Sequence, residues 1–381
     1  MQVRLLPLVD VTAEEGRAWQ DLASDAVAPN MCLDPRQLLA ARHLGERVAD
    51  LRLLVVTEGA RWLAVLALTT KRVIPRLPVQ ALTTGGDYMT LESDRHHPLV
   101  RRGRAVEALD ALLRGAPTVG LPGLALLRRF PLEGPLADAL AEVVRRRRLP
   151  VVERSRETGA WAPREAFTVL DVPDPVDGVI VDPPLSTAHL RPGDAQKLRR
   201  VVRGITRETG EPIALHLEAA RPDADDRFVE LQSAGWKGDT DRGGAAVGLD
   251  PRREHWFRDA ARAFREDGDL AVLRLAAGPH TLWTGYLARS GGGWFGMLDA
   301  YDERFRRFSP GSVGRVVAMT YLLGATDAPF VDPGFGSHYA VGARLWPAPR
   351  TQVDLLLPAG GLAAHALVRA VPLARRVGLA G

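Results

Sequence analysis

Residues 292–346 of this chain have the sequence GGWFGMLDAYDERFRRFSPGSVGRVVAMTYLLGATDAPFVDPGFGSHYAVGARLW, and the organisation of the protein follows from them. Trp294–Leu298 is a short apolar and aromatic run with a glycine inside it. This pattern is typical of a buried strand that is kinked, or that another backbone approaches closely. The polar and aromatic residues that follow, 299–308, predict a loop.

The rest of this stretch predicts a helix and another strand. The Ser-Pro-Gly segment 309–311 precedes an apolar helix over residues 316–323, and proline is favoured in the first helical turn. The first amides of a helix have no partner within it and lie at the positive end of its dipole, so they can hold an anion. Residues 330–332 then predict a strand that runs into a glycine-rich turn, 333–336. Together these elements would form a ligand cleft.

The length and composition predict a globular protein of two domains. A chain of 381 residues exceeds the usual size of one domain, and 46% hydrophobic with 25% charged residues is ordinary for chains that bury a core. The formal net charge of +4 at pH 7 is modest for this length. Such a balance tolerates anionic ligands such as phosphates, but it does not favour a dedicated nucleic-acid-binding protein.

The single cysteine and the amino-terminal residues predict a cytoplasmic protein. Cys32 cannot form an internal disulfide and is expected to be a small buried apolar residue. Residues 1–7 lack the long apolar core and small-residue cleavage site of a secretory signal. No stretch approaches the roughly 20 apolar residues of a membrane span. We therefore expect a reducing, cytoplasmic location and no membrane span.

The order of predicted elements is similar in the two halves of the chain. Prolines crowd residues 171–184, which predicts a junction between domains over 1–175 and 184–358, followed by a helical tail over 359–381. No repeat of residues is visible, but the similar order favours an α/β fold with α+β mixed sheets that is present twice. The first half predicts helices over 13–26, 106–113 and 135–146, and strands over 51–57, 62–70, 79–82, 124–127, 151–152 and 167–170. The second half predicts helices over 186–209, 223–236 and 251–267, and strands over 213–218, 270–276, 281–288, 294–298 and 352–357.

Five motifs follow one another in the second half. They are a basic helix, a segment that ends in Trp-Lys-Gly, a strand that continues into a loop, a Ser-Pro-Gly helix start, and a glycine-rich turn followed by a tyrosine. In this chain they are residues 197–203, 230–238, 298–305, 309–311, and 332–336 with Tyr339. With these motifs the second half resembles the BioF2-like, or CelD-like, acetyltransferase domain of the GNAT superfamily, which is related to the Fem-type aminoacyl-tRNA-dependent ligases.

The resemblance covers residues 186–346 closely and implies two tandem GNAT-like domains. The first half resembles the companion domain of such proteins through Trp19, Asn30 and the loop 85–88. One position departs from the pattern, because relatives commonly carry a lysine directly after the tyrosine of the last motif, where this chain has Ala340. This departure leaves the identity of the donor and of the acceptor open.

The absence of motifs for other kinds of catalysis also agrees with acyl transfer. Transfer to an amine needs a bound activated acyl group, a neutral amine next to its carbonyl, and donors that face the developing oxyanion. It requires neither a metal nor a covalent nucleophile. The chain contains no His-Glu-x-x-His, no cysteine pair and no Gly-x-Ser-x-Gly motif. Metal-dependent hydrolysis and serine-triad chemistry are therefore not favoured, and no metal is expected.

The resemblance also implies where the donor would bind. In the GNAT fold a kinked fourth strand diverges from the fifth, and acyl-CoA lies between them with its pyrophosphate at the next helix start. Trp294 and Gly296 would lie in the fourth strand, and residues 330–332 would form the fifth. The groups implied to hold the phosphates are the amides of Gly311, Ser312 and Val313, with the nearby Arg315. An ordinary proline-initiated helix explains the same residues equally well. We expect acyl-CoA, such as acetyl-CoA, as the donor substrate.

Three side chains beside this cleft are candidates for proton transfer. Asp299, at the end of the fourth strand, could accept a proton from the ammonium group of the acceptor, or bind that group. Tyr339, after the fifth strand, would donate a proton to the departing thiolate. The imidazole of His338 also suits proton transfer near neutral pH. A lone histidine is more often an ordinary surface group, so it ranks below Tyr339.

Six further residues are candidates for substrate binding. Lys237 would line the mouth of the acceptor or donor site, whereas a tryptophan at the position of Trp236 is more often a core anchor. Period-two alternation puts Tyr301 on the face of Asp299 and Asp302 on the other face, where a capped, hydrogen-bonded turn is the alternative. The remaining two candidates are Asp332 and Gly336.

These observations lead to three hypotheses about function. The first is an N-acyltransferase that moves an acyl group from acyl-CoA to a small-molecule amine by direct transfer. The second is a Fem-like ligase that uses aminoacyl-tRNA and forms a peptide bond; the arginine-rich helix near residues 197–207 would fit RNA, as it would fit a solvated face. The third is a binding module that has lost catalysis, which only the missing lysine at Ala340 supports. DNA is not an expected partner.

Overall fold

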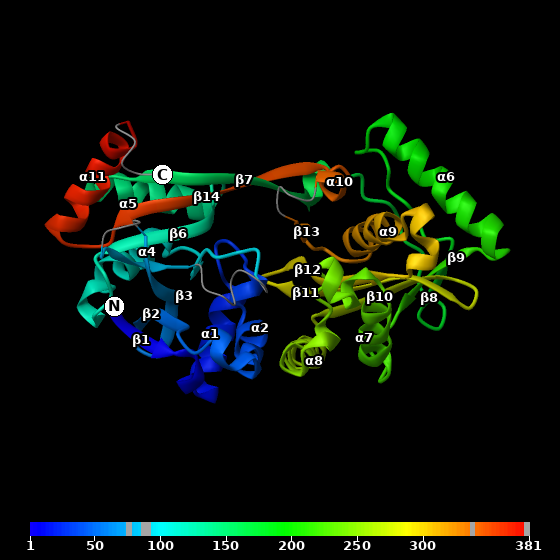
Figure 1. Cartoon of the computed structure of the whole chain (residues 1–381), viewed down its shortest axis with the longest axis horizontal. Helices are drawn as coiled ribbons and strands as arrows, with labels where there is room; N and C mark the ends of the chain where they lie inside the picture. The colour runs from blue at the N-terminus through cyan, green and yellow to red at the C-terminus, as the bar shows by residue number, and fades with distance from the viewer. Residues whose placement is uncertain (74–77, 85–92, 336–339, 377–381) are drawn as a thin grey trace. The chain divides into compact units, whose positions relative to one another are not determined.

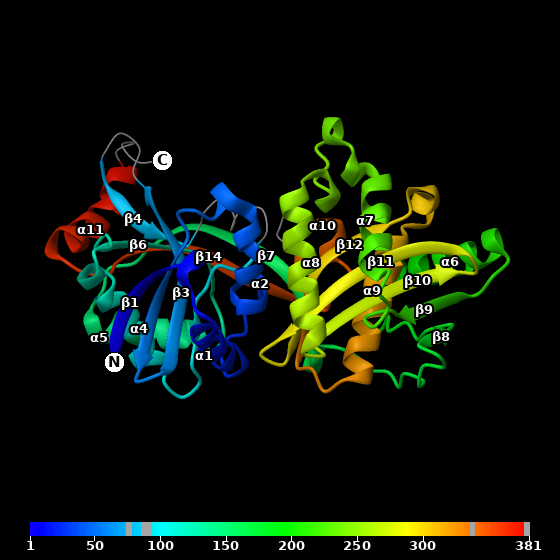
Figure 2. The ribbon, with the colours of Figure 1, turned by 90° about the horizontal axis from the view of Figure 1, so that it is seen from below.

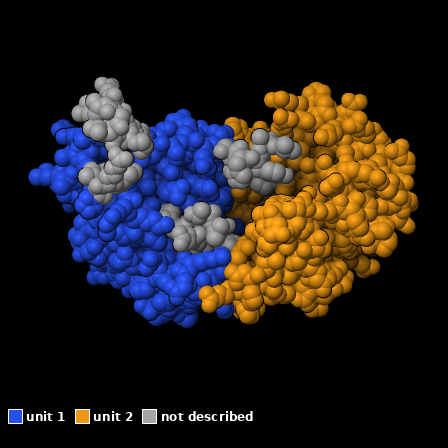
Figure 3. All heavy atoms as spheres, viewed as in Figure 1, with its two compact units in different colours: residues 1–158, 350–381 blue, residues 159–349 orange. Residues whose placement is uncertain are grey.

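The computed structural model (Figures 1 and 2) describes residues 1–73, 78–84, 93–335 and 340–376. The chain divides into two compact units (Figure 3). Unit 1 contains residues 1–158 and 350–381, and unit 2 contains residues 159–349. This division differs from the predicted boundaries at 175, 184 and 358, because two strands pair outside the half of the chain to which the sequence analysis assigns them.

Unit 1 is built on a mixed sheet. Strands β1 to β4 are antiparallel neighbours, β4 and β6 are parallel, and β6 is antiparallel to β14. The strands are β1 (Gln2–Pro7), β2 (Arg52–Glu58), β3 (Arg61–Arg72), β4 (Gln80–Thr83), β5 (Leu99–Val100), β6 (Leu124–Pro131) and β14 (Ala348–Pro358). The helices are α1 (Ala13–Ser24), α2 (Pro35–Ala40), α4 (Ala105–Gly115), α5 (Pro135–Arg147) and α11 (Leu362–Arg376). Leu109 and Leu112 of α4 and Leu140 of α5 belong to the core of this unit.

Unit 2 has a second mixed sheet with helices on both faces. Helices α7 and α8 cover one face, and α9 with α6 covers the other (Figures 1 and 2). The strands are β7 (Val152–Pro163), of which residues 160–163 pair here, β8 (Val179–Val181), β9 (Ile213–Leu217), β10 (Leu270–Ala277), β11 (His280–Ser290), β12 (Gly293–Tyr301) and β13 (Phe330–Phe335). The helices are α6 (Pro192–Thr209), α7 (Ala224–Ala234), α8 (Pro251–Glu266), α9 (Pro310–Ala325) and α10 (Ala340–Ala343). The predicted helices over 223–236 and 251–267 and the predicted three-strand meander are thus confirmed.

The two units repeat one order of strands. Each has an antiparallel meander, β1 to β4 or β9 to β12, then a helix, α4 or α9, then a parallel partner strand, β6 or β13. The antiparallel strand that follows this parallel partner comes from the other part of the chain: β7 follows α5 yet pairs with β13, and β14 follows unit 2 yet pairs with β6. The expectation of one fold present twice is confirmed.

Two expectations about the middle of the chain are wrong. Residues 167–170 form no strand, and residues 179–181, within the predicted junction, form β8. Strand β8 pairs with β9, so the proline-rich segment contributes an edge strand to unit 2. Prolines 183 and 184 lie just beyond β8, where the loss of an amide donor interrupts no ladder.

Helix α9 is longer than the apolar pattern indicates and is buried on most of its faces. It begins at Pro310, directly after Ser309, which takes a left-handed φ of 46°. Its other end is closed by Arg164, whose Nη1 donates hydrogen bonds to the carbonyl oxygens of Leu323 and Thr326 at 2.8 and 3.0 Å. Those carbonyls have no partner within the helix, and a cation is favoured at this end of the dipole. Helix α9 is therefore capped at this end, and it packs against β11 and β12.

Candidate functional site

Strand β12 carries the kink that the sequence predicts. Leu298 pairs with Tyr286 and Gly296 pairs with Leu287, so Met297 is the extra residue of a β-bulge. A Cβ at Gly296 would lie 3.0 Å from the carbonyl oxygen of Pro333, so another backbone does approach this glycine closely.

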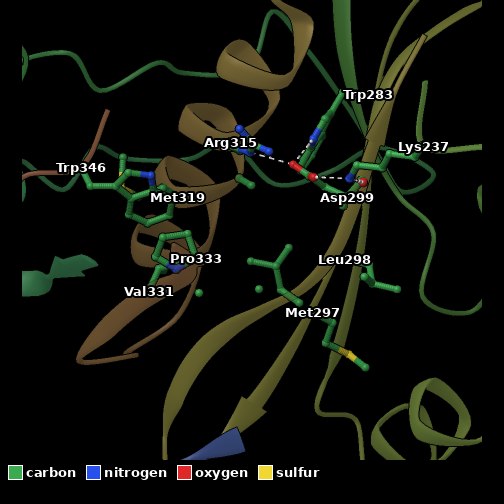
Figure 4. Close-up of a pocket in the computed structure, with 15 residues that line it drawn as sticks. Lys237, Trp283, Met297, Leu298, Asp299, Arg315, Met319, Val331, Pro333 and Trp346 are labelled. Carbon is green, nitrogen blue, oxygen red and sulfur yellow. Dashed lines mark hydrogen bonds and ion pairs between the residues drawn. The ribbon is translucent and has the colours of Figure 1, made fainter. Parts of the chain in front are cut away.

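The kinked strand separates from its parallel neighbour. Strands β12 and β13 pair only at Trp294 with Val331 and at Phe295 with Asp332, although both strands continue. From Gly296 onward this edge of β12 therefore has no β13 partner among the described residues. A cavity of about 240 Å³ occupies the gap, with α9 as its floor (Figure 4). Its apolar walls include Trp283, Leu287, Met297, Leu298, Met319, Val331 and Trp346.

At one end of this cavity two cations and an indole converge on Asp299 (Figure 4). Arg315 Nε and Trp283 Nε1 donate hydrogen bonds to Oδ2 of Asp299 at 2.7 and 3.1 Å. Lys237 Nζ donates to the backbone carbonyl of Asp299 at 2.6 Å and lies 3.5 Å from Oδ1. Burial alone would raise the pKa of Asp299, but the two cations and the hydrogen bonds lower it well below its ordinary value. The carboxylate therefore stays ionised.

The loop after α7 fixes the position of Lys237. The amide of Ala246 donates to the carbonyl of Lys237 at 2.7 Å, and the amide of Val247 donates to the buried side chain of Gln232 at 2.8 Å. A Cβ at Gly244 would overlap the carbonyl oxygen of Lys237, so only glycine lets the loop close this tightly. The backbone of Lys237 is thereby held in place while its side chain reaches β12.

Only some of the residues predicted to bind the donor line the cavity. Arg315 lines the cavity and bonds to Asp299, and Gly296 lines it too. Gly311, Ser312 and Val313 do not line it, and the amides of Ser312 and Val313 donate to the carbonyl of Ser309 at 2.9 and 3.4 Å. Phosphate binding by these amides stays a prediction. Trp294 is buried outside the cavity, and its Nε1 donates to Thr326 at 3.4 Å.

The predicted substrate-binding residues do not all share one place. Tyr301 and Asp302 line a second cavity on the α7 side. Burial alone would raise the pKa of Asp302, but its hydrogen bonds with the side chain and amide of Arg304 lower it, as in the predicted capped turn. Asp332 is buried and accepts a hydrogen bond from the amide of Gly334 at 3.0 Å. Trp236 is half-buried and lines neither cavity. The other candidates, Gly336, His338 and Tyr339, lie outside the described residues.

The described part of the chain contains neither a metal-binding cluster nor a membrane-spanning helix. Among the residues that the structure describes, no group of three or more His, Cys, Asp or Glu side chains is placed to hold a metal ion. Within the same ranges, every helix is too short or too polar to cross a bilayer.

Comparisons with known proteins identify the fold of unit 2 and of the whole chain. Residues 195–327 match the model of the acetyltransferase (GNAT) domain family. The fold is similar to that of FemX, with 12% identity, a TM-score of 0.56, and coverage of 94% of this chain and 97% of that one. A conserved protein of unknown function from Bacteroides thetaiotaomicron is similar too, with 10% identity, a TM-score of 0.55, and coverage of 92% and 98%. No curated protein sequence matches. The fold is thus a GNAT fold present twice, and the residues that match the GNAT domain model lie in unit 2.

Proposed function

We propose that unit 2 transfers an acyl group from acyl-CoA to a small-molecule amine by direct transfer. The observation that carries the proposal is the open edge of β12 beside the cavity. An extended chain with amide groups, such as the pantetheine arm of CoA, can pair with an unpartnered strand edge. The apolar walls suit the arm and the acyl chain, and the cations Lys237 and Arg315 suit the anionic parts of the donor.

The reaction then proceeds by attack of the amine nitrogen on the thioester carbonyl carbon. A C–N bond forms, the C–S bond breaks, the nitrogen loses a proton and the thiolate gains one. Negative charge that develops on the carbonyl oxygen is stabilised by backbone amides at the bulge and by the ammonium group of Lys237. Asp299 has a lowered pKa, so we assign it the positioning of Lys237 and Arg315 rather than proton abstraction. Tyr339 remains the candidate proton donor.

Thermal melting with acetyl-CoA and longer acyl-CoAs tests this proposal. A ligand at 100 times its Kd stabilises the folded state by about 2.7 kcal/mol, so the melting temperature should rise by several degrees. Leu287→Trp would fill the cavity beside the bulge, because Leu287 lines the cavity opposite Gly296, and it should weaken acyl-CoA binding at least tenfold. The same change at Leu249, an exposed residue outside the cavity, should leave binding unchanged. An unchanged melting temperature with every acyl-CoA would contradict the proposal.

A second candidate, a Fem-like ligase that uses aminoacyl-tRNA, is favoured by the surface of α6. Residues 191–209 contain six cations and two carboxylates, an excess of four that equals the net charge of the whole chain. Lys197, Arg200, Arg203 and Arg207 are exposed, and none has an ion pair in the described part of the protein. By contrast, Arg145 and Arg146 of α5 both pair with Glu142. The helix therefore presents an uncompensated positive face that fits a phosphate backbone.

Binding of aminoacyl-tRNA measured over a range of salt concentrations tests this candidate. Each phosphate contact contributes roughly 0.7 to 0.9 to the slope of log K against log salt, so removing two contacts should reduce the slope by roughly 2. We expect this result for the double variant Arg200→Glu, Arg203→Glu. The matched variant Arg145→Glu, Arg146→Glu should bind like the wild type. Equal losses from both variants would show that only the overall charge matters.

A further inference from the structure

Unit 2 has a second cavity, of about 530 Å³, on the face that α7 covers. It lies between α7, strands β10 and β11, and the end of β12. Its inner wall contains a buried carboxylate, Glu218, with an arginine on either side. Arg274 Nε donates to Oε1 of Glu218 at 2.8 Å, and Arg227 Nη2 donates to Oε2 at 2.8 Å. Both oxygens of Glu218 are therefore occupied by cations that also line the cavity.

The arginines keep donor capacity for a ligand. The side chain of Arg274 is 15% exposed and uses Nε on Glu218; over the described ranges, its two terminal nitrogens have no protein hydrogen bond. Arg227 also pairs with Asp223, which is shared with Arg221. Three arginines thus face two carboxylates in this cluster, which leaves one positive charge in excess. A guanidinium fixed by a buried partner binds an oxyanion without a further loss of side-chain freedom.

Other walls of the same cavity differ in charge. Thr281 and Thr284 add hydroxyl groups beside Arg274. Glu230 and Glu303 line it too; Glu230 is exposed, and Glu303 lies 3.8 Å from Arg242. A cavity with fixed arginines on one wall and carboxylates on another favours a small molecule that carries both an anionic and a cationic group.

The two cavities are neighbours along the chain. Asp299 and Gly285 line the first cavity, and Tyr301 and Thr284 of the same strands line the second. Two residues of a strand span about 6.6 Å. The loop after α7 is shared as well, because Gly235 lines the second cavity and Lys237 lines the first. The residues that line the two cavities are thus close to one another along β11, β12 and the loop after α7.

We propose that the second cavity binds the acceptor, and that the acceptor is an amine that also carries an oxyanion, which Arg274 and Arg227 hold. This assignment rests on the proposed acyl transfer, since it presumes that the donor fills the first cavity. The amine would extend toward Lys237 and Asp299. The oxyanion is a carboxylate or a phosphate, and the probes below separate these two sources.

Calorimetric titration of the full chain with four probes tests the assignment. Glycine, L-glutamate and O-phosphoethanolamine are amines with an oxyanion, and n-butylamine lacks one. We expect at least one of the first three to bind and n-butylamine not to bind. Binding by glycine or glutamate alone would identify a carboxylate, and binding by O-phosphoethanolamine alone would identify a phosphate. Absence of binding by all three, or equal binding of n-butylamine, would overturn the proposal.

Three variants separate ligand binding from a structural role. Arg274→Gln should weaken binding of the active probe at least tenfold. Glu218→Gln keeps the shape of the buried partner and removes its negative charge, so it should leave binding unchanged or make it tighter. A merely structural cluster would lose binding in both variants. Thr284→Val leaves the ion pairs intact and should weaken binding a few-fold even where Arg274→Gln does not fold. Wild-type affinity in both Arg274→Gln and Thr284→Val would overturn the assignment.

Melting of the same variants with acyl-CoA distinguishes this proposal from the proposed function. Arg274 does not line the first cavity, so Arg274→Gln should retain the acyl-CoA response of the wild type. Acyl-CoA binding without binding of any probe amine would refute the acceptor site alone. Binding of a probe amine without any response to acyl-CoA would refute the acyl-CoA donor and, with it, the acceptor role of the second cavity.

Discussion

Replacing Asp299 with asparagine is expected to lower the free energy of unfolding by about 3 kcal/mol at neutral pH. The change keeps the shape of the side chain and removes the negative charge that Arg315 and Lys237 share, at 2.7 and 3.5 Å. The two cations then lose the carboxylate that lies between them, and loss of one member of a largely buried ion pair is strongly destabilising. Acyl transfer should fall on the order of 100-fold, because misplaced groups at the reaction centre lose that much rate.

The pH dependence of this variant follows from the lowered pKa of Asp299. A carboxylate with a lowered folded-state pKa stabilises the protein fully above its unfolded-state pKa, about 3.9, and the contribution is lost as the pH falls through the folded-state value. The stability difference between wild type and Asp299→Asn should therefore be constant from about pH 5 to about pH 8. Urea titrations across this range measure it. A difference that changes steadily between these limits would contradict the ionised state of Asp299.

Asp302 offers a matched control three residues further along. Its partner Arg304 is 75% exposed, and its carboxylate caps the turn over residues 303–308. Asparagine caps such a turn nearly as well, and an exposed ion pair contributes little, so Asp302→Asn should cost less than about 1 kcal/mol. Equal losses in the free energy of unfolding for the two variants would mean that the network around Asp299 has no special role in stability.

The parts of the fold that depend on neighbouring residues could be predicted from the sequence. Asp250 and Pro251 begin α8 with a side-chain cap and a proline in the first turn, and both are visible in the sequence. Gly296 predicts the kink of β12, because a glycine inside an apolar strand indicates a bulge or a close backbone approach. Asp302 caps its turn through its own neighbours, as the sequence pattern indicates.

The parts that depend on distant residues could not be predicted. Lys237 reaches Asp299 across 62 residues, and no local pattern encodes that contact. The pairing of β7 with β13 and of β14 with β6 could not be predicted for the same reason, since strand pairing depends on surfaces formed by the whole unit. The sequence indicates Trp283 only indirectly: the hairpin turn sets Ser290 opposite Gly293, and the bulge at Met297 then shifts the register so that Gly285, two residues from Trp283, lies opposite Asp299. Hairpin register extended past the bulge would have pointed to it.

The hydrogen bonds at the start of α9 could not be predicted from the sequence for a different reason. The sequence indicates free first-turn amides in α9, but Ser309 adopts a left-handed φ of 46°. Its carbonyl then accepts hydrogen bonds from the amides of Ser312 and Val313. Few residues other than glycine, asparagine and aspartate take this conformation, so a serine gives no sequence indication of it.

Gly314→Ala is expected to destabilise the protein by about 2 to 3 kcal/mol and to remove the response to acyl-CoA. Gly314 lies in α9 directly under the indole of Trp283, and a Cβ there would overlap the ring. The ring has little room to move, because it is 2% exposed, it also abuts Gly285, and its Nε1 bonds to Asp299. Displacement of Trp283 would remove one of the hydrogen-bond donors that orient the carboxylate of Asp299 and would change the wall of the cavity beside β12.

Gly193→Ala is the matched control, because it makes the same change in a helix without a neighbour. Nothing lies within 4 Å of a Cβ at Gly193, in the first turn of α6. Alanine has the higher helix propensity, so this variant should be neutral or more stable by up to about 1 kcal/mol. Thermal melting with and without acyl-CoA gives both readouts. Stability changes of opposite sign in the two variants would show that contact with Trp283, rather than loss of a helical glycine, links α9 to the site. A Gly314→Ala protein that melts like the wild type and still responds to acyl-CoA would contradict the packing of Trp283 between two glycines.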